Sequence, residues 1–239
     1  MLLREAGKRE NGDFHQCFPY CFLSEHIPGT VFQTGKIGGE NGMKYITIER
    51  EYGSGGTQIG KKLAERCQIP CYGEEILERA SERLQISIDE IRQYEEKATN
   101  SVLYSIYMLC QTQALKGEML SGEGKVFVEE QNAIKEFANQ GSAIFLGHCA
   151  SEALKDANQL IRVFIHADEE SKRKRIIEEY GIAKQNVSVV AKKNDKRRTS
   201  YFTANTQKKW SDLKNYDIVL DSGKLGIEGC VNVLSGLFQ

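Results

Sequence analysis

Apolar runs with the length of strands alternate with amphipathic stretches along most of the chain. Between the runs, apolar residues recur at helical spacing, as Ile59, Leu63 and Cys67 do. Strands that alternate with helices predict a parallel sheet with helices on both faces, and therefore an α/β fold. The five predicted strands are Tyr45–Ile48, Ile69–Tyr72, Ala143–Leu146, Leu160–His166 and Asp217–Leu220.

Capping residues and apolar spacing locate the predicted helices. Ser87-Ile-Asp-Glu90 has the form of a capping box, which predicts that a helix starts there. Asp168 and the two glutamates after it are favourable in a first turn because of the helix dipole, and Gly181 is expected to end that helix. Apolar spacing predicts four further helices, which contain Ile76–Leu84, Val102–Leu115, Val126–Asn139 and Ile227–Leu234.

Residues 1–42 differ from the rest of the chain. Glycine, asparagine, histidine and isolated aromatic residues occur there without a sustained period of 2 or 3.6. We therefore expect an extension that is disordered or weakly packed, followed by one domain of residues 43–239. Four residues of the extension are of the types that bind zinc, but their spacing matches no common finger. They are His15, Cys17, Cys21 and His26.

Composition excludes several classes of function. The 239 residues carry a net charge of -1, which by itself argues neither for nor against nucleic acid, so an anion-binding surface has to come from local clustering. We expect no nucleic-acid partner. The seven cysteines contain no C-x-x-C pair, which is typical of reduced thiols in the cytoplasm. No apolar run reaches the length of a membrane span, and the first ten residues lack the apolar stretch of a signal peptide. The sequence thus predicts a cytoplasmic protein without a membrane partner.

A glycine-rich loop between the first strand and its helix is the strongest chemical signal. Glycines turn backbone N–H groups inward, and a helix N-terminus adds partial positive charge, so such a loop stabilises a phosphate. Against the P-loop pattern, Thr57 fills the position that contacts Mg²⁺, but Arg50 replaces the first glycine and Gly56 replaces the lysine. A glycine-rich turn without a ligand is the alternative. The candidate phosphate-binding residues are Gly53, Ser54, Gly55, Gly56 and Thr57.

Several stretches from Lys44 onward together carry a family resemblance. They are Ile48–Thr57, Ile59–Ala64, Tyr72–Leu77, Phe145–Ala150, and Asp195–Arg198 followed by Tyr201-Phe, Trp210-Ser-Asp and Asn215-Tyr-Asp. In these stretches the chain resembles the cytidylate kinase-like family of P-loop proteins, relatives of the nucleoside-monophosphate kinases. The resemblance implies a P-loop NTPase-type parallel sheet flanked by helices, with a helical monophosphate-binding insert and an arginine-bearing lid. It also implies transfer of the γ-phosphoryl of ATP, with Mg²⁺, to a nucleoside monophosphate, CMP or dCMP.

The basic run at residues 192–198 would belong to this lid, which the resemblance places at about 190–212. Arg197 and Arg198 offer planar donor forks to phosphate oxygens. We expect both to be exposed and to contact phosphate only when nucleotide is bound, so that their removal has little effect on folding. The alternative is a solvated helix face without a ligand.

Three residues are candidates for contact with the acceptor substrate. Glu74 and Glu75 lie where the resemblance places the start of the insert; the alternative is an acidic first helical turn. His148 occupies the position where the family usually has an arginine near the monophosphate. A structural histidine is the alternative there.

The absent loop lysine leaves the catalytic charge open. Arg50 at the strand end is our candidate to replace it, although a salt bridge to Glu49, Glu51 or another acid is an equal alternative. Lys61, one turn into the helix, is expected to point to solvent. Two other functions therefore stay open: a nucleotide-binding relative without kinase activity, with a regulatory or assembly role, and a kinase of a non-nucleotide small molecule. The sequence does not indicate an oligomeric state.

Overall fold

The computed structural model describes residues 42–97 and 122–238. The helix predicted at Val102–Leu115, the candidate zinc ligands and nearly all of the predicted extension lie outside these ranges. The described elements are, in chain order, β1 Tyr45–Arg50, α1 Gly56–Cys67, β2 Cys71–Tyr72, α2 Glu74–Leu84, α3 Ile88–Lys97, α5 Gly122–Ala138, β3 Ala143–Leu146, α6 Ala150–Ala153, β4 Leu160–His166, α7 Glu169–Glu178, α8 Val187–Thr206, η2 Leu213–Asn215, β5 Ile218–Asp221, α9 Ser222–Ser235 and η3 Gly236–Phe238.

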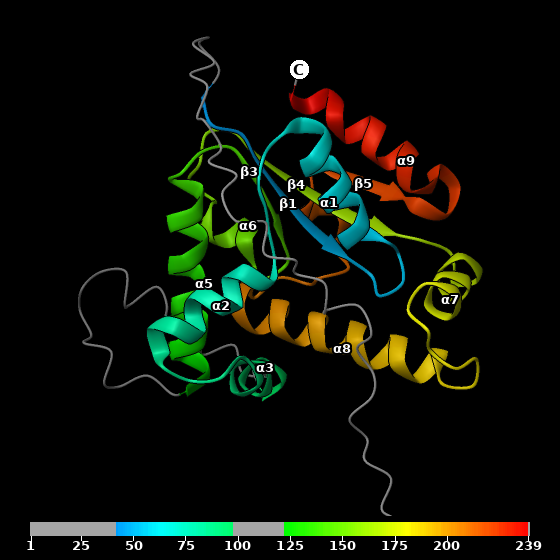
Figure 1. Cartoon of the computed structure of the whole chain (residues 1–239), viewed down its shortest axis with the longest axis horizontal. Coiled ribbons are helices and arrows are strands. Elements are labelled where there is room, and N and C mark those ends of the chain that lie inside the picture. The colour runs from blue at the N-terminus through cyan, green and yellow to red at the C-terminus, as the bar shows by residue number, and fades with distance from the viewer. Residues whose placement is uncertain (1–41, 98–121, 239) are drawn as a thin grey trace, which may run out of the picture.

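The five strands form one sheet in the order β2-β3-β1-β4-β5, and every neighbouring pair is parallel (Figure 1). In the register, Ile46 of the central strand β1 lies between Ile144 of β3 and Ile161 of β4. This confirms the predicted parallel sheet flanked by helices. Because all strands run the same way, the loops after β1 and β3 lie at one edge of the sheet, where ligands bind in such folds.

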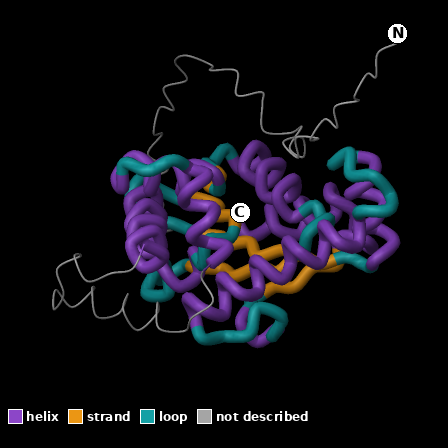
Figure 2. Tube along the Cα trace, turned by 90° about the horizontal axis from the view of Figure 1, so that it is seen from below, coloured by secondary structure: helices purple, strands orange, loops and turns teal. Residues whose placement is uncertain are grey.

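Helices cover both faces of the sheet (Figure 2). Along β1, Ile46 and Ile48 pack with Ile59 and Leu63 of α1 and with residues of α9. Tyr45 points to the opposite face, where α5 and α6 pack on the sheet. The C-terminal half of α8 adds a further aromatic cluster on that second face. Alternate side chains of a strand are thus buried on opposite sides, as a covered parallel sheet requires.

Several predicted boundaries agree with the structure. The limits of β3 and β4 are as predicted. The capping box is present, since the backbone N–H of Ser87 donates to Glu90 and the N–H of Glu90 donates to the Ser87 hydroxyl. Asp168 caps α7, which ends at Glu178, three residues before the glycine expected to end it.

Two helices differ from the prediction in their extent. The charged run at 192–198 interrupts the apolar pattern, so the sequence did not delimit α8, which is one helix of 20 residues. α9 begins at Ser222 but breaks at Gly226, whose φ of 67° is non-helical, so the predicted Ile227–Leu234 segment is the part after the break.

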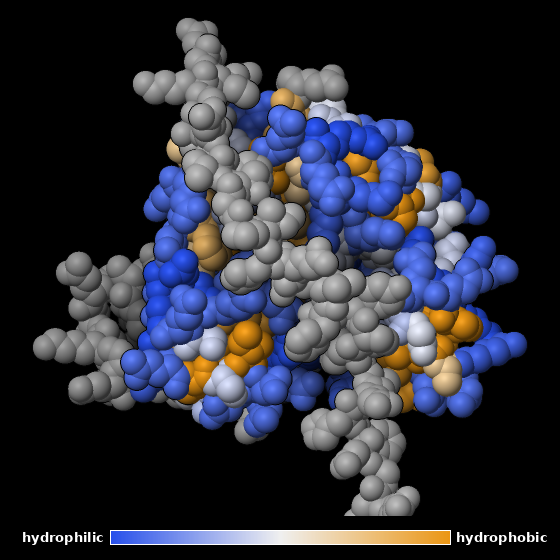
Figure 3. Space-filling view, viewed as in Figure 1, coloured by the Kyte–Doolittle hydropathy of each residue, from blue (hydrophilic) through white to orange (hydrophobic). Residues whose placement is uncertain are grey.

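Hydrophilic residues prevail on the face in Figure 3, with smaller hydrophobic areas among them. Among the described helices, none is both long and apolar enough to cross a membrane.

Candidate phosphate-binding site

The loop between β1 and α1 has the predicted strand–loop–helix geometry. Gly53 and Gly55 take φ values of 82° and 76°, which only glycine adopts without strain. Gly55 is the N-cap of α1, and the N–H of Ile59 is bonded back to its carbonyl. The amides before Ile59 form the open helix N-terminus, which favours an anion.

The side chain of Arg50 runs across two glycines. A Cβ added at Gly56 would lie 2.5 Å from the Cβ and 2.8 Å from the Cγ of Arg50. A Cβ added at Gly147, just after β3, would lie 2.5 Å from Arg50 Nη1. Arg50 thus passes over the first residue of α1 and reaches the end of β3. Glycine stands in the usual position of the loop lysine because Arg50 fills that space.

Arg50 forms no ion pair with the acids nearest to it in sequence. Glu49 accepts a hydrogen bond from Trp210 Nε1 at 3.0 Å, and Glu51 pairs with Lys172 Nζ at 3.1 Å. Within the described ranges no other carboxylate forms an ion pair with Arg50, and its buried Nε has no hydrogen-bond partner. Burial lowers the pKa of Arg50 below its ordinary value. A buried guanidinium without a counter-ion is a binding group for an anion.

Helix α8 is attached to the start of the loop. Arg198 Nη1 donates to the carbonyl of Arg50 at 2.9 Å, and the N–H of Tyr52 donates to Asp195 Oδ1 at 2.7 Å. The Arg198 side chain is only 20% exposed, so the expectation that it is an exposed charge is wrong. Burial, together with the charges of Arg50 and Arg197, lowers the pKa of Arg198 to about 10.

The basic run divides between two faces of α8. Lys192, Lys193 and Lys196 are exposed, whereas Arg197 and Arg198 are partly buried and line the pocket. The solvated-face interpretation therefore applies to the lysines. The two arginines lie beside Arg50, within one group of three guanidinium side chains.

Helix α7 contributes a basic residue that the sequence analysis missed. Arg175 Nη1 donates to the carbonyl of Gly53 at 2.5 Å. Its buried Nε lies 3.7 Å from Glu179 Oε1 and has no hydrogen-bond partner among the described residues. A Cβ at Gly55 would lie 3.2 Å from the Arg175 guanidinium, so this side chain lies over the loop. No sequence pattern marks it, because Arg175 is one of many charged residues in α7.

A pocket of about 600 Å³ joins most of the predicted site residues. Gly53, Ser54, Gly55 and Gly56 belong to the adjoining loop and are not part of its lining. Lys61 is exposed, as expected, and it also lines the pocket. The predicted residues in the lining are Arg50, Thr57, Glu74, Glu75, His148, Arg197 and Arg198.

Carboxylates dominate the pocket wall formed by α2 and α3. Glu74 and Glu75 open α2, and Glu74 pairs with Arg92 of α3. Glu75 accepts the N–H of Gly73 at 2.8 Å. The two acids therefore fit the first-turn interpretation and also line the pocket. Three other acids on α3 line this wall: Asp89, Glu95 and Glu96.

His148 lies between two acids that the sequence analysis did not single out. Its Nδ1 is 3.2 Å from Glu95 Oε1 and 3.8 Å from Glu130 Oε1. Burial alone would lower the pKa of His148, but the two carboxylates outweigh it and raise the pKa to about 10. A signal for Glu130 existed: it lies four residues after Val126 and four before Ile134, on the apolar face of α5.

The segment predicted as a lid contains two different parts. Its first residues carry the pocket-lining arginines, whereas Tyr201, Phe202 and Trp210 are buried against Phe164 and Phe127. These three aromatic residues thus belong to the core, whereas Gln207, Lys208 and Lys209 between them are exposed. A moving lid stays a prediction.

Comparisons with known proteins agree with this architecture. A model of the cytidylate kinase-like family matches residues 45–224. None of the curated proteins matches the sequence. A solved structure of an uncharacterized protein from Eubacterium ventriosum ATCC 27560 is similar, with 26% identity, a TM-score of 0.58, and coverage of 82% of this chain and 98% of that one.

Two further solved structures, at lower identity, match over the same share of this chain. Shikimate kinase from Bacteroides thetaiotaomicron has 16% identity and a TM-score of 0.45, over 82% of this chain and 98% of that chain. TT1252 from Thermus thermophilus has 15% identity and a TM-score of 0.47, over 82% of this chain and 97% of that chain.

Proposed function

The chain belongs to the cytidylate kinase-like family, and we propose that it transfers the γ-phosphoryl group of ATP to a nucleoside monophosphate, CMP or dCMP. The observation that carries this proposal is the path of Arg50 over Gly56 to Gly147. It supplies a positive charge at the loop position from which the lysine is absent. Phosphoryl transfer depends mainly on such positioning and charge neutralisation.

The loop residues and the three arginines have distinct roles in this proposal. The amides of the glycine loop bind the β- and γ-phosphates, and Thr57, which is exposed and lines the pocket, contacts Mg²⁺. Arg50, Arg197 and Arg198 neutralise the moving phosphoryl group. Because the wall at α2 and α3 lies on the other side of the same pocket, Glu74, Glu75 and His148 contact the acceptor.

The donor set fits a triphosphate better than it fits the usual Mg²⁺ arrangement. Two buried guanidiniums and an open helix N-terminus match a polyphosphate anion. Gly147 follows β3 where an aspartate commonly completes the Mg²⁺ site, so Thr57 and the phosphates themselves hold the ion.

Two observations favour the other functions that the sequence left open. Gly147 in place of an aspartate and Gly56 in place of a lysine favour a nucleotide-binding relative without transfer. The carboxylates along α2 and α3 favour an acceptor with hydrogen-bond donors and little negative charge, including a non-nucleotide small molecule.

Turnover of ATP·Mg²⁺ against a panel of nucleoside monophosphates and uncharged hydroxyl compounds, with the binding of each measured in parallel, tests the proposal. We expect turnover with CMP or dCMP above the other monophosphates. Binding without turnover would select the nucleotide-binding function. Turnover only with uncharged hydroxyl compounds would select the small-molecule kinase.

A further inference from the structure

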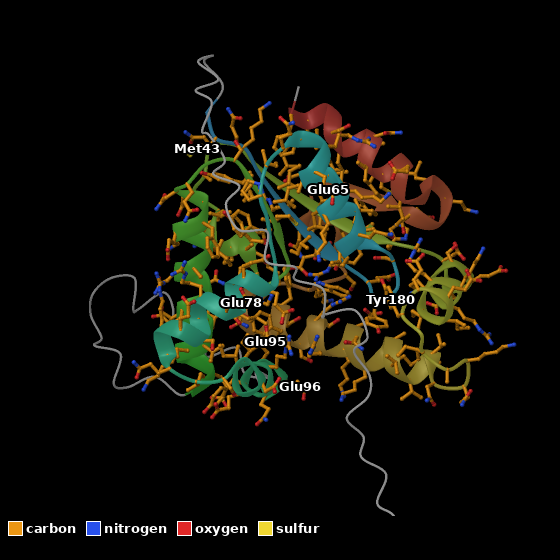
Figure 4. All side chains as sticks on the ribbon, viewed as in Figure 1. Met43, Glu65, Glu78, Glu95, Glu96 and Tyr180 are labelled. Carbon is orange, nitrogen blue, oxygen red and sulfur yellow. The ribbon has the colours of Figure 1, made fainter. Side chains whose placement is uncertain are left out.

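Three potential metal ligands meet at one corner of the pocket. Glu95 comes from α3, Glu130 from α5, and His148 from the turn after β3. Their ligand atoms all lie within 4.8 Å of one another. Figure 4 shows Glu95 on the side of α3 that faces the body of the protein, whereas the neighbouring Glu96 lies on the outer side. The cluster is thus assembled from three separate elements.

Two atoms of this cluster lack the partners that buried polar groups normally have. Glu130 is 0% exposed; its Oε2 accepts a hydrogen bond from the hydroxyl of Tyr201, but its Oε1 has no hydrogen-bond partner among the described residues. His148 Nδ1 is buried and also lacks one. Leaving buried polar atoms without a hydrogen bond is unfavourable, so such atoms normally have a partner. His148 Nδ1 lies within ion-pair distance of Glu95 Oε1, at 3.2 Å, and of Glu130 Oε1, at 3.8 Å, without a hydrogen bond to either. An ion held among these three atoms would give Glu130 Oε1 and His148 Nδ1 the partner that they lack.

The charge and spacing of the cluster suit a divalent cation. Two carboxylates and one imidazole leave a net charge of about −1 even when the imidazole is protonated. Metal–ligand bonds of about 2.0–2.2 Å in tetrahedral geometry place neighbouring ligand atoms about 3.4 Å apart. The distances from His148 Nδ1, 3.2 and 3.8 Å, lie on either side of that value. An imidazole nitrogen together with carboxylate oxygens favours a transition metal over Mg²⁺ or Ca²⁺.

We propose that Glu95, Glu130 and His148 bind a divalent transition-metal ion whose remaining coordination positions open toward the pocket. Glu95 and His148 line the pocket, whereas Glu130 lies behind them. Three protein ligands with an open fourth position is the arrangement of zinc sites that bind a substrate oxygen.

One consequence rests on the proposed function. Without a cation, two carboxylates at this corner repel an anionic acceptor. With one, the corner is neutral and offers a coordination position to an oxygen of the acceptor. Metal binding itself requires no nucleotide. The metal site and the proposed kinase function can therefore be tested, and contradicted, independently of each other.

Calorimetric titration of the full chain, first dialysed against a chelator and kept free of nucleotide, tests the site. We expect one Zn²⁺ or Co²⁺ per chain, visible Co²⁺ absorption, and much weaker binding of Mg²⁺. Glu95→Gln and His148→Ala should each weaken Zn²⁺ affinity by at least ~10-fold. Glu96→Gln, which removes the same charge at the next residue of α3, should leave the affinity unchanged.

A double variant distinguishes this cluster from the other candidate zinc ligands in the sequence. Cys17→Ser with Cys21→Ser should leave Zn²⁺ binding intact. Loss of binding in that double variant with retention in His148→Ala would overturn the proposal, and so would the absence of stoichiometric binding by the full chain. Because the Glu95 side chain is only 12% exposed, a melting curve of Glu95→Gln is needed to show that the fold is kept. A CMP titration with and without Zn²⁺ then measures the link to the acceptor.

Discussion

On the glycine-loop side of the pocket, Arg50 and Arg198 are buried close together, and Arg175 lies over the loop. On the α2–α3 side, carboxylates outnumber the basic groups, and Glu95 and Glu130 share one histidine. On the first side Arg50 has no ion pair among the described residues, and Arg198 and Arg175 each have one distant carboxylate partner, at 3.9 and 3.7 Å. On the second side the acids share Arg92 and His148 as ion-pair partners. The difference teaches that each side carries an excess of one charge, which favours a polyphosphate at the loop and a cation or a donor-rich group at the helices.

Replacing Arg50 should have the largest effect on this comparison. Arg50→Ala removes the charge that substitutes for the loop lysine, so turnover should fall by at least ~100-fold, the scale of one lost preorganised contact. Arg50→Lys should recover only part, because a point charge does not reproduce the guanidinium fork. Steady-state kinetics check both. Arg66→Ala, at an exposed arginine near the end of α1, should keep full turnover. Full turnover in Arg50→Ala would mean that α8 supplies the charge.

The packing of Arg50 on Gly56 predicts that the two positions are coupled. Gly56→Lys restores the usual loop residue but places its Cβ 2.5 Å from that of Arg50, so overpacking should cost about 1–3 kcal/mol. Adding Arg50→Gly should recover most of that stability and part of the turnover. Thermal melts of the double-mutant cycle measure this coupling. Gln58→Lys, at an exposed position of the same helix, is the matched control. Additive effects would show that Gly56 and Arg50 are independent.

Arg198 should destabilise the protein when no anion is bound. Burial and neighbouring arginines lower the pKa of Arg198 to about 10. Below pH 10 the side chain is charged in both the folded and the unfolded chain, so the folded state bears the full cost of burying the charge. This cost decreases only as the pH rises above 10, where Arg198 loses its proton in the folded state. Arg198→Met keeps the aliphatic packing and removes the charge. We expect its melting temperature at pH 7 to equal or exceed that of the wild type, while stabilisation by added pyrophosphate falls.

Two controls accompany this variant. Lys196→Met, at an exposed position of α8, should change neither quantity. A lower melting temperature in Arg198→Met would show that the hydrogen bond to the carbonyl of Arg50 outweighs the charge repulsion. Changing both Arg197 and Arg198 to Ala should reduce turnover more than substrate affinity, because contacts that tighten in the transition state act on turnover.

The sheet and the loop could be predicted from the sequence because their signals are local. Strand length, glycine punctuation and the capping box at Ser87 each act within a few residues. The charge pairing was not predictable, because it depends on long-range packing. Glu51 pairs with Lys172, 121 residues away, and therefore does not pair with its neighbour Arg50. The position of Arg198 beneath the loop depends likewise on the docking of α8.

Among the described residues, those that line both sides of the pocket all come after Met43, so we expect removal of residues 1–42 to have the smallest effect. The hydrophobic clusters of the described ranges include every strand of the sheet and draw on residues from Tyr45 onward. A chain that begins at Met43 should therefore keep the melting temperature and the nucleotide affinity of the full chain. Because about 1 kcal/mol moves the melting point of a domain of this size by roughly 2–4 °C, a loss of several degrees would show that the extension packs on the core.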